Sequence, residues 1–157
     1  MPQLFELLLR KGISDDLTTI LARMYQEEES TIKINNRNHK TIKIRKGVRQ
    51  GSVSSPFLFL FVMNELVGKL ETKMQGYTVG TRIKKRIRTL MFADDLVLLA
   101  NTPTEMNRTL RILEEWANEF NLEINTNKSE LIVQRNNDKT PVKLFGETLI
   151  PKKELNT

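Results

Sequence analysis

The segment 90–100, LMFADDLVLLA, places two adjacent acids inside an otherwise apolar run. Short apolar runs of this kind are typical of buried strands. Asp94 and Asp95 are costly there unless their carboxylates reach water, a cation or hydrogen bonds. A hairpin tip meets that requirement, because it exposes both side chains at the end of two strands. The segment therefore predicts a β-hairpin whose turn carries the acid pair.

The flanking sequence predicts four helices. Pro2 to Arg10 has leucines at helical spacing, and Gly12 ends it. A second helix follows Ser14, which can cap it. A third begins at Ser55-Pro56, read as cap and first helical residue, and runs to about Met74. The fourth has a complete start signal in the segment 102–105, TPTE, with a threonine cap, a proline and a glutamate three residues after the cap.

Alternating and apolar segments predict the strands, which are expected over 31–35, 41–45, 77–80, 86–90, 96–100, 122–125 and 131–134 and in the segment VKLFGETLI. The first two are joined by polar residues and suggest a hairpin. Helices, a hairpin, a helix, a hairpin, a helix and more strands follow one another along the chain. This order predicts an α+β fold with an antiparallel sheet and packed helices.

Composition narrows the class of protein. The 157 residues fit one domain, and the net charge of +6 with a pI near 9.7 favours nucleic acid as a partner, although such a charge can also serve solubility alone. There is no cysteine, so disulfides and thiol catalysis are excluded, and His39 is the single histidine. The apolar run Phe57 to Met63 is too short to span a membrane, and the first residues do not resemble a signal peptide. We expect a soluble intracellular protein with no membrane partner.

Adjacent aspartates suit a hard cation. Mg²⁺ prefers oxygen ligands and commonly takes one or two carboxylates together with substrate phosphates. Two such ions can hold the attacking and leaving oxygens of a phosphoryl displacement. The alternative is a turn without chemistry, because aspartate favours turns for its own hydrogen bonding.

Three segments resemble motifs of reverse transcriptases, in the family's order. Residues 91–99, MFADDLVLL, resemble the catalytic acid-pair motif in its FADD form. Residues 47–66, GVRQGSVSSPFLFLFVMNEL, resemble the motif that contacts template and nucleotide, and residues 122–132, LEINTNKSELI, resemble the next motif. The FADD form of the acid-pair motif and the helix predicted after it are similar to the non-LTR, LINE-type branch. Group II intron and retron enzymes are an alternative, although they typically carry tyrosine where Phe92 stands.

The resemblance implies a role for each matching residue. Asp94 and Asp95 would be catalytic metal ligands for Mg²⁺ or Mn²⁺, and Lys128 would be a catalytic lysine that neutralises or protonates the leaving pyrophosphate. Phe92 would pack beneath the acid pair, at the nucleotide site. The expected template and nucleotide contacts are Arg49, Gln50, Gly51 and Phe92. Without the resemblance, Gly51 could be an ordinary loop glycine, and Lys128 could be a solvated loop lysine.

A basic run lies between two predicted strands near the acid pair. Clustered cations bind nucleic acid by releasing its counterions. The run could also be a solvated turn, but the family's substrate is a template–primer duplex, which favours phosphate contact. The residues expected at the nucleic-acid backbone are Arg82, Lys84, Lys85 and Arg86.

The sequence also departs from the family. A third metal-binding aspartate, in a motif resembling D-x-x-x-A-F-D, would precede Pro2, and the primer grip and thumb would follow the last residues. Val53-Ser54 stands where the family commonly has Pro-Leu. We therefore expect residues 1–157 to form part of a palm region with an incomplete two-metal site and little or no activity by itself.

The partners implied by the resemblance are an RNA template with a DNA primer, deoxynucleotides and the remainder of the polymerase. A nuclear location is also implied. The alternatives are a catalytically inactive nucleic-acid-binding remnant and a degenerate reading frame whose product does not fold stably.

Overall fold

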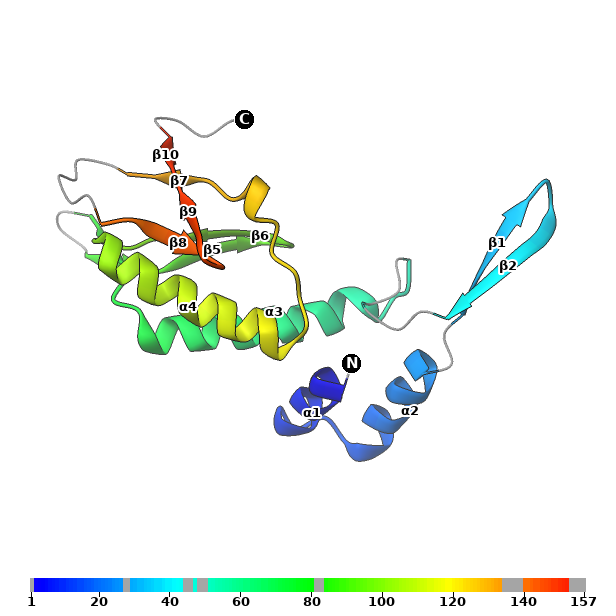
Figure 1. Cartoon of the computed structure of the whole chain (residues 1–157). Helices are drawn as coiled ribbons and strands as arrows, with labels where there is room; N and C mark the ends of the chain where they lie inside the picture. Colours follow the sequence, from blue (N-terminus) through cyan, green and yellow to red (C-terminus); the bar gives the residue numbers. More distant parts are fainter. Residues whose placement is uncertain are drawn as a thin grey trace. The chain divides into compact units, whose positions relative to one another are not determined.

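The computed structural model describes residues 2–26, 29–43, 47, 51–80, 84–133 and 140–152. The chain divides into two compact units, residues 1–63 and residues 64–157, which we call the first and second units. Figure 1 labels the helices and strands. Helix α3, Ser55–Lys73, contributes its first half to the first unit and its second half to the second.

The first unit begins with two helices, α1 (Pro2–Arg10) and α2 (Asp15–Gln26). As predicted, Gly12 ends α1: its φ is +85°, and the Ile13 N–H donates back to the Leu8 carbonyl at 3.1 Å. Ser14 caps α2 through a long hydrogen bond of 3.4 Å from the Leu17 N–H. The buried apolar side chains of this unit are Leu4, Leu7, Leu8, Tyr25, Leu58, Val62 and Met63.

Ser55 was predicted to cap α3, but it is instead the first residue of the helix. Its side chain is buried and its hydroxyl lies 3.0 Å from the hydroxyl of Tyr25. The reason is tertiary, because a buried tyrosine hydroxyl needs a polar partner and Ser55 supplies one. The predicted end of α3 near Met74 is confirmed.

The predicted hairpin of the first unit is also confirmed, with different limits. Strands β1 (Glu29–Ile34) and β2 (Arg37–Lys43) are antiparallel, and Asn35 and Asn36 form the turn. Both asparagines have positive φ, 49° and 63°, which is the pattern of a type I′ turn. The residues expected in the connection, NRNHK, therefore lie partly in β2, because a two-residue turn suffices.

In its described residues, the second unit contains three antiparallel hairpins and one parallel strand pair. The hairpins are β3–β4 (Tyr77–Val79, Lys85–Ile87), β5–β6 (Thr89–Phe92, Asp95–Leu98) and β8–β9 (Val142–Leu144, Glu147–Leu149). The parallel pair joins β7 (Leu131–Ile132) with β10 (Pro151–Lys152). Among the described residues these strands form pairs rather than one sheet, so the α+β class is confirmed and the parallel pair was not predicted.

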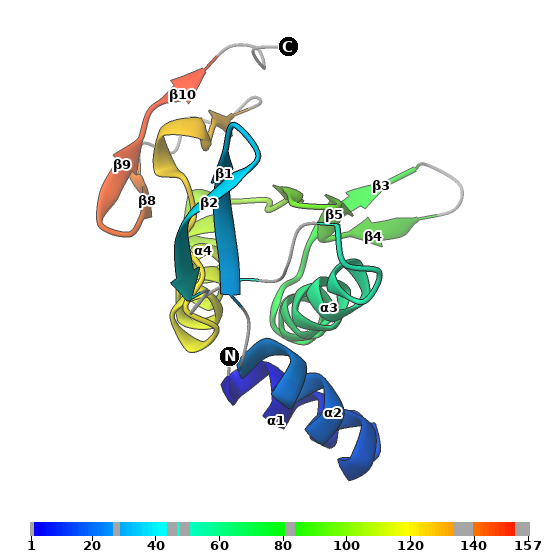
Figure 2. The same cartoon turned by 90° about the vertical axis from the view of Figure 1, so that its right-hand side faces the viewer.

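Helix α4 (Pro103–Glu119) lies beside the second half of α3, as Figures 1 and 2 show, and Lys69 forms an ion pair with Glu119 between them. The predicted cap is confirmed, since the Thr102 hydroxyl accepts from the Glu105 N–H at 3.1 Å. The buried side chains on α4 include Leu110, Leu113, Trp116 and Ala117.

The strand predicted over Leu122–Asn125 is wrong. Asn121 has a φ of +53°, and the Leu122 N–H donates to the Ala117 carbonyl at 2.8 Å. This is the backbone pattern that closes a helix C-terminus. Asn125 then caps the short 3₁₀ helix η1 (Thr126–Lys128), so local capping prevents an extended conformation.

Two side chains of α4 bind the backbone around β8. Asn107 accepts from the Lys143 N–H at 2.9 Å and donates to the Pro141 carbonyl at 2.8 Å. About two helical turns after Asn107, the Glu114 side chain accepts from the Phe145 N–H. In the part of the chain that the structure describes, no helix is long and apolar enough to cross a membrane.

Candidate active site

The acid pair lies at the tip of the β5–β6 hairpin, as predicted. Phe92 pairs with Asp95, so Ala93 and Asp94 alone form the turn. Both aspartates are exposed. The next pairs inward are Met91 with Leu96 and Leu90 with Val97. The hairpin thus places two neighbouring carboxylates at the end of a short, regular ribbon.

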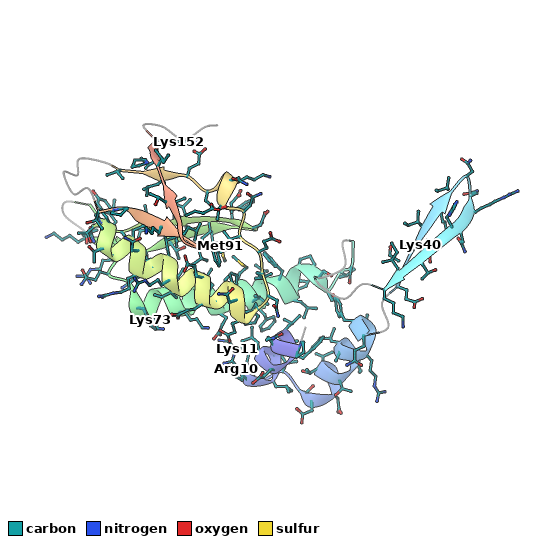
Figure 3. The ribbon with its side chains drawn as sticks, in the orientation of Figure 1. Arg10, Lys11, Lys40, Lys73, Met91 and Lys152 are labelled. Atoms are coloured by element: carbon teal, nitrogen blue, oxygen red, sulfur yellow. The ribbon has the colours of Figure 1, made fainter. Side chains whose placement is uncertain are left out.

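The two faces of this hairpin differ. Paired residues share a face, so Leu90, Phe92, Asp95 and Val97 lie on one side. This open face has exposed fractions of 54% for Leu90, 83% for Phe92 and 49% for Val97. The opposite face, which includes Met91 (labelled in Figure 3), is partly buried. The expectation that Phe92 packs beneath the acids is wrong, because its position in the register directs it to the open face beside Asp95.

The turn itself holds an alanine in an unfavourable conformation. Ala93 has a φ of +52°, whereas Asp94 is not in the left-handed region. Positive φ at the first central residue only is typical of a type II′ turn, where glycine is preferred. An L-residue in the left-handed region costs on the order of 1 kcal/mol. The turn that presents the acids is therefore under backbone strain.

The other end of the hairpin is held by the residues around Gly76. The Leu99 N–H donates to the Arg88 carbonyl at 2.9 Å, and Arg88 Nε donates to the Met74 carbonyl at 2.9 Å. A Cβ on Gly76, whose φ is +74°, would lie 2.5 Å from Arg88 Cγ and 2.8 Å from the Ile87 carbonyl oxygen. Only glycine fits this crossing of α3's end and the hairpin.

Glu105 completes this anchor. Its carboxylate accepts from the backbone N–H groups of Gln75 (3.1 Å), Gly76 (2.9 Å) and Asn101 (3.0 Å), and from the Asn101 side chain (3.2 Å). Asn101 Nδ2 also donates to the Gly76 carbonyl at 2.8 Å. Burial raises the pKa of Glu105, but hydrogen bonds from Asn101, Gly76 and Gln75 outweigh it, and the pKa lies below its ordinary value of 4.5.

Sequence reasoning assigned Glu105 to the helix start only. In the usual capping box its carboxylate would reach the N–H of the cap residue, Thr102. It binds Asn101 instead, together with backbone groups about 30 residues earlier in the chain. The TPTE segment predicts that Glu105 stabilises the start of the helix, but no local pattern predicts its contacts with Gln75 and Gly76.

The basic run lies on the neighbouring hairpin. Val79 pairs with Lys85 and Thr78 with Arg86, so these two basic residues alternate between faces. Lys84, Lys85 and Arg86 are exposed. The fourth predicted residue, Arg82, lies outside the described residues.

Lys128 lies on a separate turn after α4. It is the last residue of η1, its N–H donates to Asn125 Oδ1 at 3.2 Å, and its side chain is exposed. Local hydrogen bonds thus fix the backbone around it.

The motif expected at the template and nucleotide is described in part. Gly51 is an exposed turn residue with a φ of +84°, and it belongs to the first unit, whereas the acids belong to the second. Arg49 and Gln50 lie outside the described residues. Nothing within 4 Å would meet a Cβ on Gly51, so its conformation rather than crowding favours glycine.

A complete metal site is not formed by the described part of the chain. No group of three or more histidine, aspartate or glutamate side chains there could hold an ion. The acid pair therefore supplies two carboxylates from adjacent positions and no third.

The sequence matches the family described as "Reverse transcriptase (RNA-dependent DNA polymerase)" over residues 2–149. The chain belongs to the reverse transcriptase family. It is 32% identical over 124 residues to a retrovirus-related Pol polyprotein from the type-1 retrotransposable element R2 of Popillia japonica, which covers 78% of this chain and 17% of that protein. The R2 polyprotein of Nasonia vitripennis is 30% identical over 121 residues, 77% of this chain and 11% of that protein.

These relatives confirm the predicted branch, a reverse transcriptase domain of the LINE type. The chain spans less than a fifth of each of these two relatives, 17% of one and 11% of the other. All three motifs that indicated the family lie within the matched residues, 2–149.

Proposed function

We propose that this reverse transcriptase domain is part of the polymerase palm and that Asp94 and Asp95 bind the divalent metal of RNA-directed DNA synthesis. One observation supports the proposal most. A two-residue turn presents both carboxylates, exposed, at the tip of the β5–β6 hairpin in a chain of this family. A position at a hairpin tip lets metal and phosphate approach from solvent, which a buried pair would prevent.

The donor set fits magnesium or manganese in its chemistry. Carboxylate oxygens are hard ligands, and Mg²⁺ commonly takes one or two of them along with substrate phosphates. When bound, the metal would neutralise phosphate charge and favour attack by the primer's terminal hydroxyl. Asp94, at the apex of the turn, is the expected inner ligand, and Asp95 the second.

The other site residues would hold the nucleic acid and the nucleotide. The basic run just before the β5–β6 hairpin would contact template–primer phosphates. Its members are Arg82 and the exposed residues Lys84, Lys85 and Arg86. Arg49, Gln50 and Gly51 would contact the template base and the incoming nucleotide. Phe92, on the open face with Asp95, would contact the nucleotide rather than support the acids from below.

Lys128 would act on the leaving pyrophosphate. Its ammonium group can neutralise or protonate that group, and the capped turn around it limits the backbone motion that would move it. The remaining ligand of a two-metal site would come from the rest of the polymerase, because the described residues supply two carboxylates at the tip.

The test is primer extension on an RNA template with Mg²⁺ or Mn²⁺, in the longest protein that contains these residues. Asp94→Asn keeps the side-chain size but weakens metal binding, so we expect extension to fall by at least about a thousandfold. Glu115→Gln, at an exposed carboxylate on α4, is the matched control and should retain extension. Equal activity of wild type and Asp94→Asn would refute the proposal.

For residues 1–157 alone we expect little or no extension, since positioning of both ions supplies most of the rate. Robust extension that Asp94→Asn abolishes would contradict this expectation while supporting the site. Template binding without extension, in the longer protein as well, would favour the inactive remnant.

A further inference from the structure

A second basic region, distinct from the run beside the acid pair, lies in the first unit. Between Glu29 and Glu65 the chain has 35 residues without a single acid, and seven of them are lysine or arginine. Four of the seven lie in the β1–β2 hairpin, namely Lys33, Arg37, Lys40 and Lys43. Charge separation of this extent creates a local positive field that favours a polyanionic partner.

These four side chains are available for binding. Every residue of β1 and β2 is exposed. Among the residues that the structure describes, none of the four forms an ion pair. Figure 3 shows side chains extending from both sides of this ribbon, with Lys40 labelled.

The register assigns the four cations to both faces of the ribbon. Lys33 pairs with Asn38 and Lys43 with Glu29, which places both lysines on one face. Lys40 pairs with Ile32 and Arg37 with Ile34, which places these two on the other. The register shift between Ile32 and Lys33 leaves His39 as the extra residue of a β-bulge and preserves this division.

We propose that the β1–β2 hairpin binds double-stranded DNA by lying in the major groove, with each face directed to the phosphates of one groove wall. A flat surface would engage only one face of the ribbon, whereas a groove has phosphates on both sides. The major groove of B-form DNA is about 12 Å wide and admits a two-stranded β-ribbon. The proposal concerns binding alone and does not depend on polymerase activity.

The exposed isoleucines agree with this occupant. Ile32, Ile34 and Ile42 lie on the Lys40 face and are 45%, 51% and 45% exposed. In a groove they would contact sugars and thymine methyl groups. An A-form RNA duplex is a poorer fit, because its major groove is too narrow for side chains to enter. A protein partner that covered these isoleucines would have to carry acids opposite Lys40 and Arg37, which share their face.

The test is fluorescence anisotropy of the 157-residue chain with a 20-base-pair DNA duplex, an RNA duplex of the same sequence and a single DNA strand. Buffers contain EDTA and no nucleotide, so failure of the metal site cannot affect the result. The test variant replaces Lys33, Arg37, Lys40 and Lys43 with glutamine. We expect its affinity for duplex DNA to fall about tenfold to a thousandfold, and the slope of log K against log salt to become shallower by about 3 to 4.

The matched control removes four exposed charges elsewhere by Lys73→Gln, Arg108→Gln, Arg111→Gln and Lys143→Gln. It should keep the wild-type slope, and a Lys33→Arg, Lys40→Arg, Lys43→Arg variant should keep the affinity. Melting curves establish that each variant is folded. The proposal is overturned by wild-type binding of the glutamine variant, by equal losses in the control, or by an equal loss on the RNA duplex.

Discussion

The β1–β2 and β5–β6 hairpins both close with two-residue turns, but their turn residues fit the backbone to different degrees. Asn35 and Asn36 adopt positive φ, which asparagine tolerates better than other non-glycine residues. Ala93 adopts it without any such advantage. The first turn follows from local sequence, and the second must be imposed by its surroundings.

The two hairpins also differ in how firmly the end opposite the turn is attached to the rest of the protein. The β5–β6 hairpin is tied to α3 and α4 through Arg88, Gly76 and Glu105. In the β1–β2 hairpin every residue is exposed. The comparison indicates that an unfavourable turn persists where the rest of the hairpin is fixed in place. Each variant below tests one part of this difference.

The largest effect is expected for Gly76→Ala. The added Cβ would meet Arg88 Cγ at 2.5 Å, and alanine is strained at a φ of +74°. We expect the free energy of unfolding to fall by about 2–4 kcal/mol, measured by urea denaturation. Gly68→Ala is the control, because Gly68 lies inside α3 with nothing within 4 Å of its Cβ. That change should stabilise by up to about 1 kcal/mol. A neutral Gly76→Ala would show that the anchor is not tightly packed.

Glu105→Gln comes next. The amide keeps the shape but loses the charge that four N–H donors share, so we expect a loss of about 1–2 kcal/mol, reduced by partial exposure of the side chain. Thermal melting at pH 7 measures it. The same loss in Glu115→Gln, which has an exposed side chain on α4, would mean that the anchor adds nothing.

The pH dependence of this loss follows from the pKa. The folded-state pKa of Glu105 lies below the ordinary value of 4.5. The unfolded chain therefore binds this proton first, and the stabilisation is complete above about pH 4.5 and lost as pH falls through the folded value. The gap between wild type and Glu105→Gln should narrow below pH 4.5, and a gap that widens there would contradict the assignment.

Features of this fold that have a local sequence signal could be predicted, and those that depend on distant contacts could not. Helix limits at Gly12, Thr102 and Met74 were predictable because caps and periodicity are local signals. The acid hairpin was predictable because two charges interrupt an apolar run. The strain at Ala93 was not, since alanine gives no turn signal. The contact of Glu105 with Gly76 joins residues 29 positions apart, which no local pattern encodes.

Ala93→Gly tests the strain in the acid turn. Glycine adopts a φ of +52° without steric cost but loses more chain entropy, so we expect a net gain of about 0.5–1 kcal/mol in the free energy of unfolding. Differential scanning calorimetry would show a higher Tm. A lower Tm would mean that the alanine methyl group makes contacts worth more than the strain.

Asn36→Gly should have the smallest effect. Asn-Gly is the preferred type I′ pair, but asparagine already suits the turn, so we expect a change below about 0.5 kcal/mol. Amide hydrogen exchange in β1 and β2 would detect it. A gain as large as that of Ala93→Gly would remove the contrast between the two turns.

The attachment of β8 to α4 has a further consequence for how this region tolerates substitution. Asn107 and Glu114 bind the carbonyl of Pro141 and the N–H groups of Lys143 and Phe145. Every residue type has a carbonyl and every type except proline has an N–H, so these contacts do not depend on the side chains of the strand. Substitution of the exposed side chain of Lys143 should therefore leave the strand in place, whereas substitution of Asn107 or Glu114 should release it.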